Sequence, residues 1–337
     1  MLDRLRAGGS GRAALAAALL FLALAPGVAG AALLIRFSHV VAEDTPKGLA
    51  ANRFKALVEQ RSEQRIRVAV YPSARLYGDL DEMEALRLGA VEMVAPSLSK
   101  FGRIGFPEFE LFDLPFLFDS NSEVRRVTQG AIGQRLLVQL RQQGLVGLGY
   151  LDNGLKQMSA NRPLLAPEDF KGLRMRIQFS RVLASQFKAL GARPVPLAFS
   201  ETARALATGV VDGTENPVSN FWTQGMHKYQ TDLSLTDHGY VGYAVVANGR
   251  FWNSLSEPDR TLIEQALREA LEYGNQIADT QNAKALEALR EAGTTRIHVL
   301  SPAQRARLRK VVQPVYDELA QRIGGSWIEE AQKALGR

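Results

Sequence analysis

A short basic strand is the first segment whose side chains suit the binding of a negatively charged group. In FKGLRMRIQFS (170–180), the apolar residues Leu173, Met175 and Ile177 alternate with two arginines, so we predict a strand with one apolar and one basic face. From such a strand, the rigid guanidinium of Arg176 could give two parallel N–H donors to a carboxylate. A basic face exposed to solvent is the alternative, and the segment alone does not decide between the two.

A crowded turn is the second such segment. In VVDGTENPVSNFW (210–222), Asn216 directly precedes Pro217, which disfavours helical backbone at the asparagine and suits the first position of a following helix. Asn216 could simply cap that helix. Alternatively, the free N–H groups and the positive dipole end of the helix, together with the Asn216 amide, could bind an anion. The two interpretations do not exclude each other, and both stay open.

Two further side chains occur in polar or turn-like surroundings. Lys156 follows the Asp-Asn-Gly turn in LDNGLKQMS, and Phe199 ends the segment VPLAF before a serine. Taken singly, the lysine is more typical of a solvated surface and the phenylalanine of a packed core. Neither residue indicates a function without its neighbours.

The sequence lacks the common signatures of catalysis and of metal binding. It contains no cysteine, which excludes disulfides, thiolate nucleophiles and cysteine-ligated metals. Its four histidines are not spaced as metal ligands, and it has no Walker loop, no GxSxG motif and no GxGxxG motif after a predicted strand. We therefore expect no metal, no cofactor and no catalytic residue.

Strands and helices alternate along the segments that must position these residues. Strands are predicted over 34–40 and 65–72, and Thr45 with Pro46 begins the helix between them. This alternation indicates βαβ units with a mainly parallel sheet, so the predicted fold class is α/β. In the second half, LVGLGYLDN, KQMSAN and YVGYAVVANG are predicted as separate strands.

The longest predicted helix covers about residues 257–292. Ser256 and Asp259 form a capping box at its start, and Gly293 ends the apolar periodicity. At 1.5 Å per residue such a helix is ~54 Å long. A chain of 337 residues favours two domains, and the helix is longer than one of them, so we expect it to span both.

The N-terminal residues have the composition of an export signal. A basic head precedes the apolar run at 13–25, and small residues up to Ala31 suit cleavage, so residues 1–31 are predicted to be a signal peptide. The run is shorter than the ~20 apolar residues that span a membrane. Because residues 1–31 contain three arginines and one aspartate, the mature chain keeps +4 of the whole chain's +6 and shows no basic block typical of nucleic-acid binding.

Several segments together resemble the solute receptors of the tripartite ATP-independent periplasmic (TRAP) transporters over essentially the whole mature chain. They occur in this order: FSHVVAEDTPKG, YPSARLYGD, FELFDLPFLF, LDNGLKQMSANRP, FKGLRMRIQ, PLAFSE and GVVDGTENPVSN. Within that family, the chain looks most like the C4-dicarboxylate receptors, which bind succinate, malate and fumarate.

The resemblance implies a two-domain periplasmic binding protein fold with a ligand cleft between the domains. The implied domain I is 32–151 with 239–280, and the implied domain II is 152–238 with 281–337. The long helix would span both domains. Closure of the domains around an organic acid is the expected working motion.

The resemblance also assigns roles to the four residues described above. Arg176 would hold the ligand carboxylate, Asn216 would assist it, and Phe199 would pack on the ligand. Lys156 would add a second contact, and because sialic-acid receptors have arginine at this place, a lysine argues against sialic acid. The resemblance further suggests His39, Lys47 and Ser97 from the first domain, and His238 near a domain crossing, as contributors.

We therefore expect a periplasmic receptor, not an enzyme, that passes a C4-dicarboxylate to the small and large membrane subunits of a TRAP permease. Neither nucleic-acid binding nor membrane insertion of the mature chain is expected. Three alternatives remain: a receptor for another organic acid, a sensor module that signals to a receptor, and a secreted lyase acting on organic acids. Turnover of the acid would indicate the lyase, and the identity of the protein partner would separate sensing from transport.

Overall fold

The computed structural model describes residues 32–337, and the predicted signal peptide lies outside the described residues. Residues Leu34–Arg337 form one compact unit by their internal contacts. Within 32–337, every helix is too short or too polar to cross a lipid bilayer.

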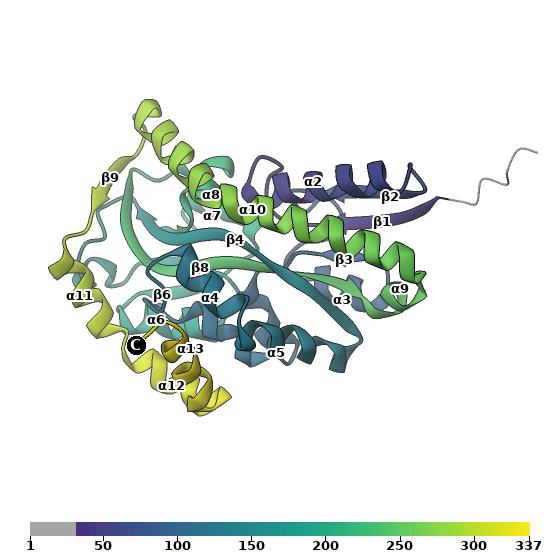
Figure 1. Cartoon of the computed structure of the whole chain (residues 1–337). Helices are drawn as coiled ribbons and strands as arrows, with labels where there is room; N and C mark the ends of the chain where they lie inside the picture. Colours follow the sequence, from purple (N-terminus) through teal and green to yellow (C-terminus); the bar gives the residue numbers. More distant parts are fainter. Residues whose placement is uncertain (1–31) are drawn as a thin grey trace, which may run out of the picture. The chain divides into compact units, whose positions relative to one another are not determined.

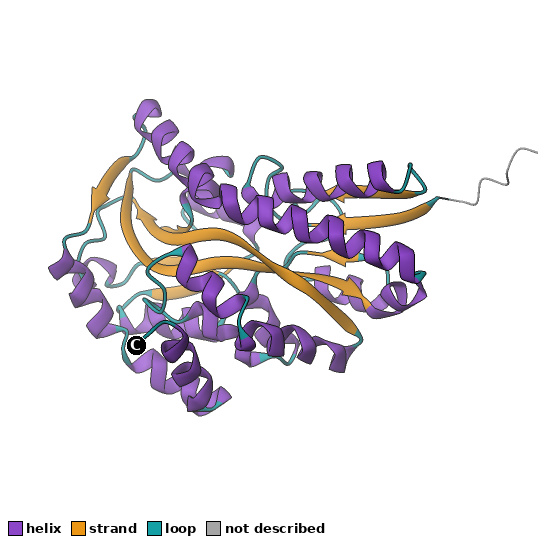
Figure 2. Cartoon of the chain, viewed as in Figure 1, coloured by secondary structure: helices purple, strands orange, loops and turns teal. Residues whose placement is uncertain are grey.

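A nine-stranded mixed sheet runs through the described residues (Figure 2), with strand order β2-β1-β3-β8-β4-β7-β5-β6 and β9 beside β8. The strands are β1 Leu33–Ser38, β2 Ile66–Tyr71, β3 Met93–Val94, β4 Leu145–Ala160, β5 Arg174–Ile177, β6 Arg193–Pro196, β7 Gly213–Asn216, β8 Asp232–Asn248 and β9 Arg296–Val299. The α/β class is confirmed. The expectation of a mainly parallel sheet is wrong for the centre, where β8 pairs antiparallel with β3 and β4, and β4 pairs antiparallel with β7.

The two longest strands are the main departure from the predicted elements. β4 unites LVGLGYLDN and KQMSAN in one strand, and β8 begins eight residues before the predicted start at Tyr240. β4 bends without ending because its register with β8 shifts at three irregularities, one of them between Asp152 and Gly154. Gly154 has φ +149°, and a Cβ there would stand 2.7 Å from the side chain of Asn282, so only glycine fits this bend.

Helices flank the sheet and connect its strands. The α-helices are α2 Pro46–Arg61, α3 Glu82–Leu88, α4 Asn121–Thr128, α5 Ala131–Gln139, α6 Arg181–Ala189, α7 Thr202–Ala207, α8 Val218–Thr223, α9 Gly249–Ser254, α10 Glu257–Ala292, α11 Pro302–Val311, α12 Pro314–Ile323 and α13 Gly325–Ala334. The 3₁₀ helices are η1 Leu98–Ile104, η2 Pro107–Asp113, η3 Leu140–Gln143, η4 Pro167–Phe170, η5 Phe199–Glu201 and η6 Met226–Lys228.

The predicted helix caps at Thr45 and Ser256 are confirmed. The Thr45 hydroxyl accepts the Gly48 N–H at the start of α2, and the Ser256 hydroxyl accepts the Asp259 N–H at the start of α10. α10 has the predicted 36 residues and ends at Gly293 with left-handed backbone. It packs against α2, β4 and α8, and it follows the long curved strands β4 and β8 (Figure 1).

Candidate functional site

Arg176 is held inside the protein by strand β5. The alternation predicted for this strand is confirmed, since Met175 and Ile177 are fully buried in the apolar core while the arginines point the other way. Arg174 pairs with Asp212 at the surface, with Nη2 2.6 Å from Oδ1. By contrast, Arg176 is only 2% exposed.

The guanidinium of Arg176 is fixed by the backbone. Its Nε and Nη2 atoms donate to the Leu197 carbonyl over 3.1 and 2.8 Å, and Nη1 has no hydrogen-bond partner among residues 32–337. Burial lowers the pKa of Arg176 from its ordinary value, while the carboxylates of Asp79 and Glu215 act in the opposite direction. A buried guanidinium with a free N–H edge is the arrangement that binds an anionic oxygen.

Phe199 lies beside this guanidinium. Its ring centroid is 5.8 Å from Arg176 Cζ, within the range of a cation–π contact, and the side chain is buried. The Phe199 backbone N–H donates to the carboxylate of Asp79, which is 120 residues earlier in the chain. Phe199 is therefore held by two contacts, one from its ring to Arg176 and one from its backbone N–H to Asp79.

Asn216 is the last residue of β7, and the structure corrects its interpretation as a helix cap. The cap position is Pro217, whose backbone is extended at φ −58° and ψ 150°, and α8 begins at Val218. Asn216 instead continues the pairing with β4, opposite Gln157, and its Nδ2 donates to Thr214 Oγ1 over 3.0 Å. Register also places Arg176 opposite Thr214, so Arg176 and Asn216 come from the same part of the sheet.

The N-terminus of α8 offers less to an anion than its sequence indicated. The Ser219 N–H, one of the first free donors of the helix, is taken by Asn282 Oδ1 from α10 at 3.0 Å. Because this side-chain oxygen comes from a helix more than sixty residues later, the turn sequence alone could not reveal it.

Lys156 and His238 meet at one buried carboxylate. Lys156 Nζ lies 2.8 Å from Glu215 Oε1, and His238 Nε2 lies 2.7 Å from Glu215 Oε2. The histidine's other nitrogen, Nδ1, is 2.7 Å from Thr236 Oγ1. Burial alone raises the pKa of Glu215, but Lys156 and His238 more than reverse this and lower it to about 2. Lys156 is thus a buried, paired cation and not a solvated surface lysine.

His39, Lys47 and Ser97 form a second group of buried polar residues. Lys47 Nζ donates to the Ala95 carbonyl over 2.8 Å and lies 3.6 Å from the ring centroid of Tyr243. Ser97 pairs with Tyr243 through an isolated antiparallel bridge. Burial is the main cause that lowers the pKa of Lys47 to about 7, so its charge is only weakly compensated.

Several polar atoms of this second group have no partner within the described chain. Both ring nitrogens of His39, the Ser97 hydroxyl and the neighbouring Ser38 hydroxyl are buried without a hydrogen bond. Burial lowers the pKa of His39 to about 3, which keeps the imidazole neutral. Since a buried polar atom usually has a partner, this group is suited to a polar guest.

The match to a known family agrees with this geometry. A sequence profile described as bacterial extracellular solute-binding protein, family 7, matches residues 37–322. The chain belongs to this family. It is a family of solute-binding receptors and not of enzymes, and the predicted resemblance to TRAP solute receptors is confirmed.

Family 7 relatives cover most of this chain. The C4-dicarboxylate-binding periplasmic protein DctP of Rhodobacter capsulatus is 50% identical over 302 residues, which is 90% of this chain and 91% of the relative. A TRAP periplasmic solute-binding protein from Shewanella oneidensis, solved with bound succinate, superposes with a TM-score of 0.89 at 43% identity, covering 90% and 99% of the two chains. A second one, from Pseudomonas aeruginosa PAO1 with bound L-malate, has a TM-score of 0.83 at 40% identity, covering 85% and 99%.

Sequence reasoning missed four polar residues that surround the predicted ones. Glu215 stands directly before Asn216 in the same motif, so its position was visible, but its lysine and histidine partners were not. The other three residues are Asp79, Lys100 and Tyr243. Asp79 ends the family-like segment YPSARLYGD, but no local pattern indicates the contacts of these three residues, because each acquires its role from residues brought near by the fold.

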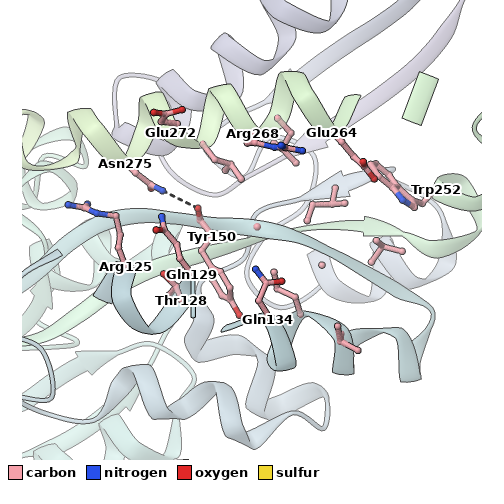
Figure 3. A pocket seen from close by; sticks show the side chains of 18 of the residues that line it. Arg125, Thr128, Gln129, Gln134, Tyr150, Trp252, Glu264, Arg268, Glu272 and Asn275 are labelled. Atoms are coloured by element: carbon pink, nitrogen blue, oxygen red, sulfur yellow. Dashed lines mark hydrogen bonds between the residues drawn. The ribbon is translucent and has the colours of Figure 1, made fainter. Parts of the chain in front are cut away.

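A groove of about 780 Å³ lies elsewhere (Figure 3), between α10, β4 and the α4–α5 segment. It is lined by Arg125, Tyr150, Trp252 and Arg268 among others, and by none of the eight predicted site residues. Asn275 of α10 donates to the Tyr150 carbonyl over 3.3 Å at its wall. Its lining mixes both signs of charge on exposed side chains, so the buried cationic residues remain the better candidate for a carboxylate site.

Proposed function

We propose that this protein is an extracytoplasmic receptor that binds a C4-dicarboxylate of the succinate, malate or fumarate type and delivers it to a TRAP membrane permease. The observation that carries the proposal is the presence of two buried cationic centres with unused hydrogen-bonding capacity, around Arg176 and around Lys47. Relatives named for C4-dicarboxylate binding, at up to 50% identity, support it.

The first ligand carboxylate belongs beside Arg176. A carboxylate that leaves water needs charged hydrogen bonds to replace its hydration. The free Nη1 of Arg176 supplies such a donor, and Phe199 covers the guanidinium with its ring. The Asn216 amide, whose Nδ2 donates to Thr214 Oγ1 and Met226 Sδ, would supply a neutral donor by exchanging one of these bonds for the ligand. This assignment uses the geometry of the described residues and the role that the family resemblance gives them.

The second carboxylate belongs beside Lys47. Lys156, the other candidate cation, already has a carboxylate partner in Glu215. Among residues 32–337, Lys47 donates only to a backbone carbonyl, and His39 and Ser97 of the same group have no partner. A second negative charge would therefore be neutralised best at Lys47. Lys156 and His238 would act indirectly, by fixing the orientation of Glu215.

Charged contacts of this kind can account for the affinity of a transport receptor when several act together. A hydrogen bond to a charged group contributes roughly 1.5–3 kcal/mol, whereas micromolar affinity corresponds to about 8 kcal/mol. Several charged contacts with closure of the site over the ligand reach this range without covalent chemistry.

Ligand entry requires the protein to open. All eight site residues are at most 6% exposed, so a solute reaches Arg176 only if the surrounding segments separate. We propose that the two predicted domains, 32–151 with 239–280 and 152–238 with 281–337, are the two lobes that move apart. Three elements would then cross between the lobes: β4, β8 and α10. The closed form would be the state that the permease recognises.

The place of action follows from the same proposal. A family of extracellular solute-binding proteins, together with the predicted signal peptide at 1–31, supports a periplasmic location. The permease subunits are the expected protein partners, and catalysis is not expected.

Binding measurements test the proposal directly. Purified mature protein should gain thermal stability with succinate, malate or fumarate, and less with the matching monocarboxylates. Arg176→Ala should lose this gain, while Arg174→Ala, on the same strand but paired at the surface, should keep it. An unchanged gain in Arg176→Ala would refute the assigned role, and conversion of the acid during the assay would indicate a lyase instead.

A further inference from the structure

We propose that Asp79 is a positioning residue that ties together the two sides of the ligand site and holds it closed. This inference rests on the proposed function, because it concerns the opening that ligand entry requires. Asp79 lies in the loop between β2 and α3 and is the last residue of the segment YPSARLYGD, whose sequence indicates no partner for its carboxylate.

The carboxylate of Asp79 has one partner on each side of the site. One oxygen pairs with Lys100 Nζ of η1, and the other accepts the backbone N–H of Phe199 at the start of η5. The Asp79 side chain is 6% exposed. Burial alone raises the pKa of Asp79, but Lys100 and the Phe199 N–H more than offset this, so its pKa is lowered and the group is a carboxylate at neutral pH.

The Lys100 side of this arrangement is rigid. Lys100 Nζ also pairs with Glu82 at the start of α3, and both side chains are buried. Nearby carboxylates raise the pKa of Lys100 despite its burial, which keeps it charged. Asp79 is therefore anchored on its own side and presents its second oxygen to the segment that follows β6.

An independent contact joins the same two sides. Arg103, one 3₁₀ turn after Lys100 on η1, places its guanidinium carbon 4.6 Å from the ring centroid of Phe179. Phe179 follows β5, which carries Arg176, and Phe199 follows β6, which pairs with β5, so both contacts reach the ends of these neighbouring strands. η1 and its neighbouring loop thus contact the Arg176 region at two points.

Opening of the site would break the bond from Phe199 to Asp79. Asp79 would keep Lys100, while the Phe199 N–H would lose a charged acceptor, so this bond stabilises the closed form relative to the open one. Its removal should mainly accelerate ligand release, because release waits for opening. The effect should be equal for ligands of the same length, since the bond touches protein and not solute.

The Asp79 carboxylate could instead weaken ligand binding. Asp79 acts electrostatically on both Arg176 and Lys47, the two cations assigned to the ligand. If its main influence were competition with the ligand's charge, its removal would tighten binding. The direction of the change therefore distinguishes the two roles.

Stopped-flow release and calorimetric titration of succinate, malate and fumarate test the inference. Asp79→Ala should raise the release rate roughly 10-fold or more, with little change in association rate and the same factor for each acid. Asp79→Asn, whose amide oxygen can still accept the Phe199 N–H, should recover part of the loss. The matched control is Asp81→Ala, because within the described part of the chain the Asp81 side chain accepts only the Gly78 N–H, over 2.7 Å, in the same loop.

An unchanged release rate, tighter binding, or an equal effect of Asp81→Ala would overturn the inference. If Asp79→Ala did not fold, Arg103→Ala, a change at an exposed side chain, should still accelerate release. If the wild-type protein bound none of the three acids, the proposed function would fail by itself. Amide hydrogen exchange at Phe199 would then decide the inference, with faster exchange expected in Asp79→Ala and equal exchange contradicting it.

Discussion

Lys47 should make the affinity for the ligand depend on pH, because the pKa of this lysine lies near neutrality. Burial is the main cause that lowers the pKa of Lys47 from an ordinary 10.5 to about 7. Of the charged groups around it, Glu82 and Asp79 favour the charged lysine, whereas Lys100 opposes it. His39, whose pKa is lowered to about 3, stays neutral throughout the neutral range.

The direction of this pH dependence follows from how strongly Lys47 holds its proton in the empty and in the ligand-bound protein. Above pH 7, Lys47 is increasingly neutral in the empty protein, whereas a ligand carboxylate beside it favours the charged form. Binding then takes up a proton, so the dissociation constant should rise with pH by at most ~10-fold per unit, or ~1.4 kcal/mol. Below pH 7, Lys47 is already charged and the dissociation constant should be nearly constant.

Calorimetry between about pH 6.5 and pH 9, in buffers with different ionisation enthalpies, measures both the affinity and the proton uptake. Lys47→Met should weaken binding and abolish the pH dependence above 7. Lys55→Met, on the same helix with its ammonium 3.3 Å from Glu59, is the matched control and should behave like wild type. A Lys47→Met protein that kept the wild-type pH dependence would show that another group binds the second carboxylate.

Three further predictions concern residues that support the site or the bend of β4, namely Glu215, Asn275 and Gly154. The free energy of unfolding should fall as pH drops from 4.5 towards 2, since the pKa of Glu215 is lowered from 4.5 to about 2, and Glu215→Gln should flatten that part of an acid titration. Asn275→Leu should cost roughly 1–3 kcal/mol in urea unfolding, because a backbone N–H and a C=O of β4 lose their partner. Gly154→Ala should destabilise by about 1–3 kcal/mol through its φ and its clash with Asn282, and more than Gly172→Ala, where φ is also positive but the space is open.

Local patterns predicted much of the fold correctly. The caps at Thr45 and Ser256 depend on hydrogen bonds within one helical turn, and the two faces of β5 depend on simple alternation, so neighbouring residues suffice to define them. The 36-residue length of α10 was likewise readable from its apolar spacing and its terminal glycine. The family motifs added the assignment of Arg176 to the ligand, which stays a prediction; the structure shows that this residue is buried.

Local sequence patterns could not predict where a strand continues or whether it runs parallel or antiparallel to its neighbours. β4 was predicted as two strands because its glycines and its Asp-Asn-Gly turn are typical of a break. In the structure, β8 pairs with β4 on both sides of each irregularity, and Asn275 and Asn282 of α10 bond to the irregular backbone of β4, so β4 bends instead of ending. A partner strand and a helix that follow about a hundred residues later decide this outcome.

The sequence by itself therefore determined the class of the fold, the ends of its helices, the two faces of β5 and the family. Only the tertiary structure decided which charges remain for a ligand. It pairs Lys156 with Glu215, 59 residues away, while it leaves Lys47 with a backbone carbonyl. The physical reason is that hydrogen bonds within a turn are set by neighbouring residues, whereas the energy of a buried charge depends on which distant groups the sheet brings within a few ångströms.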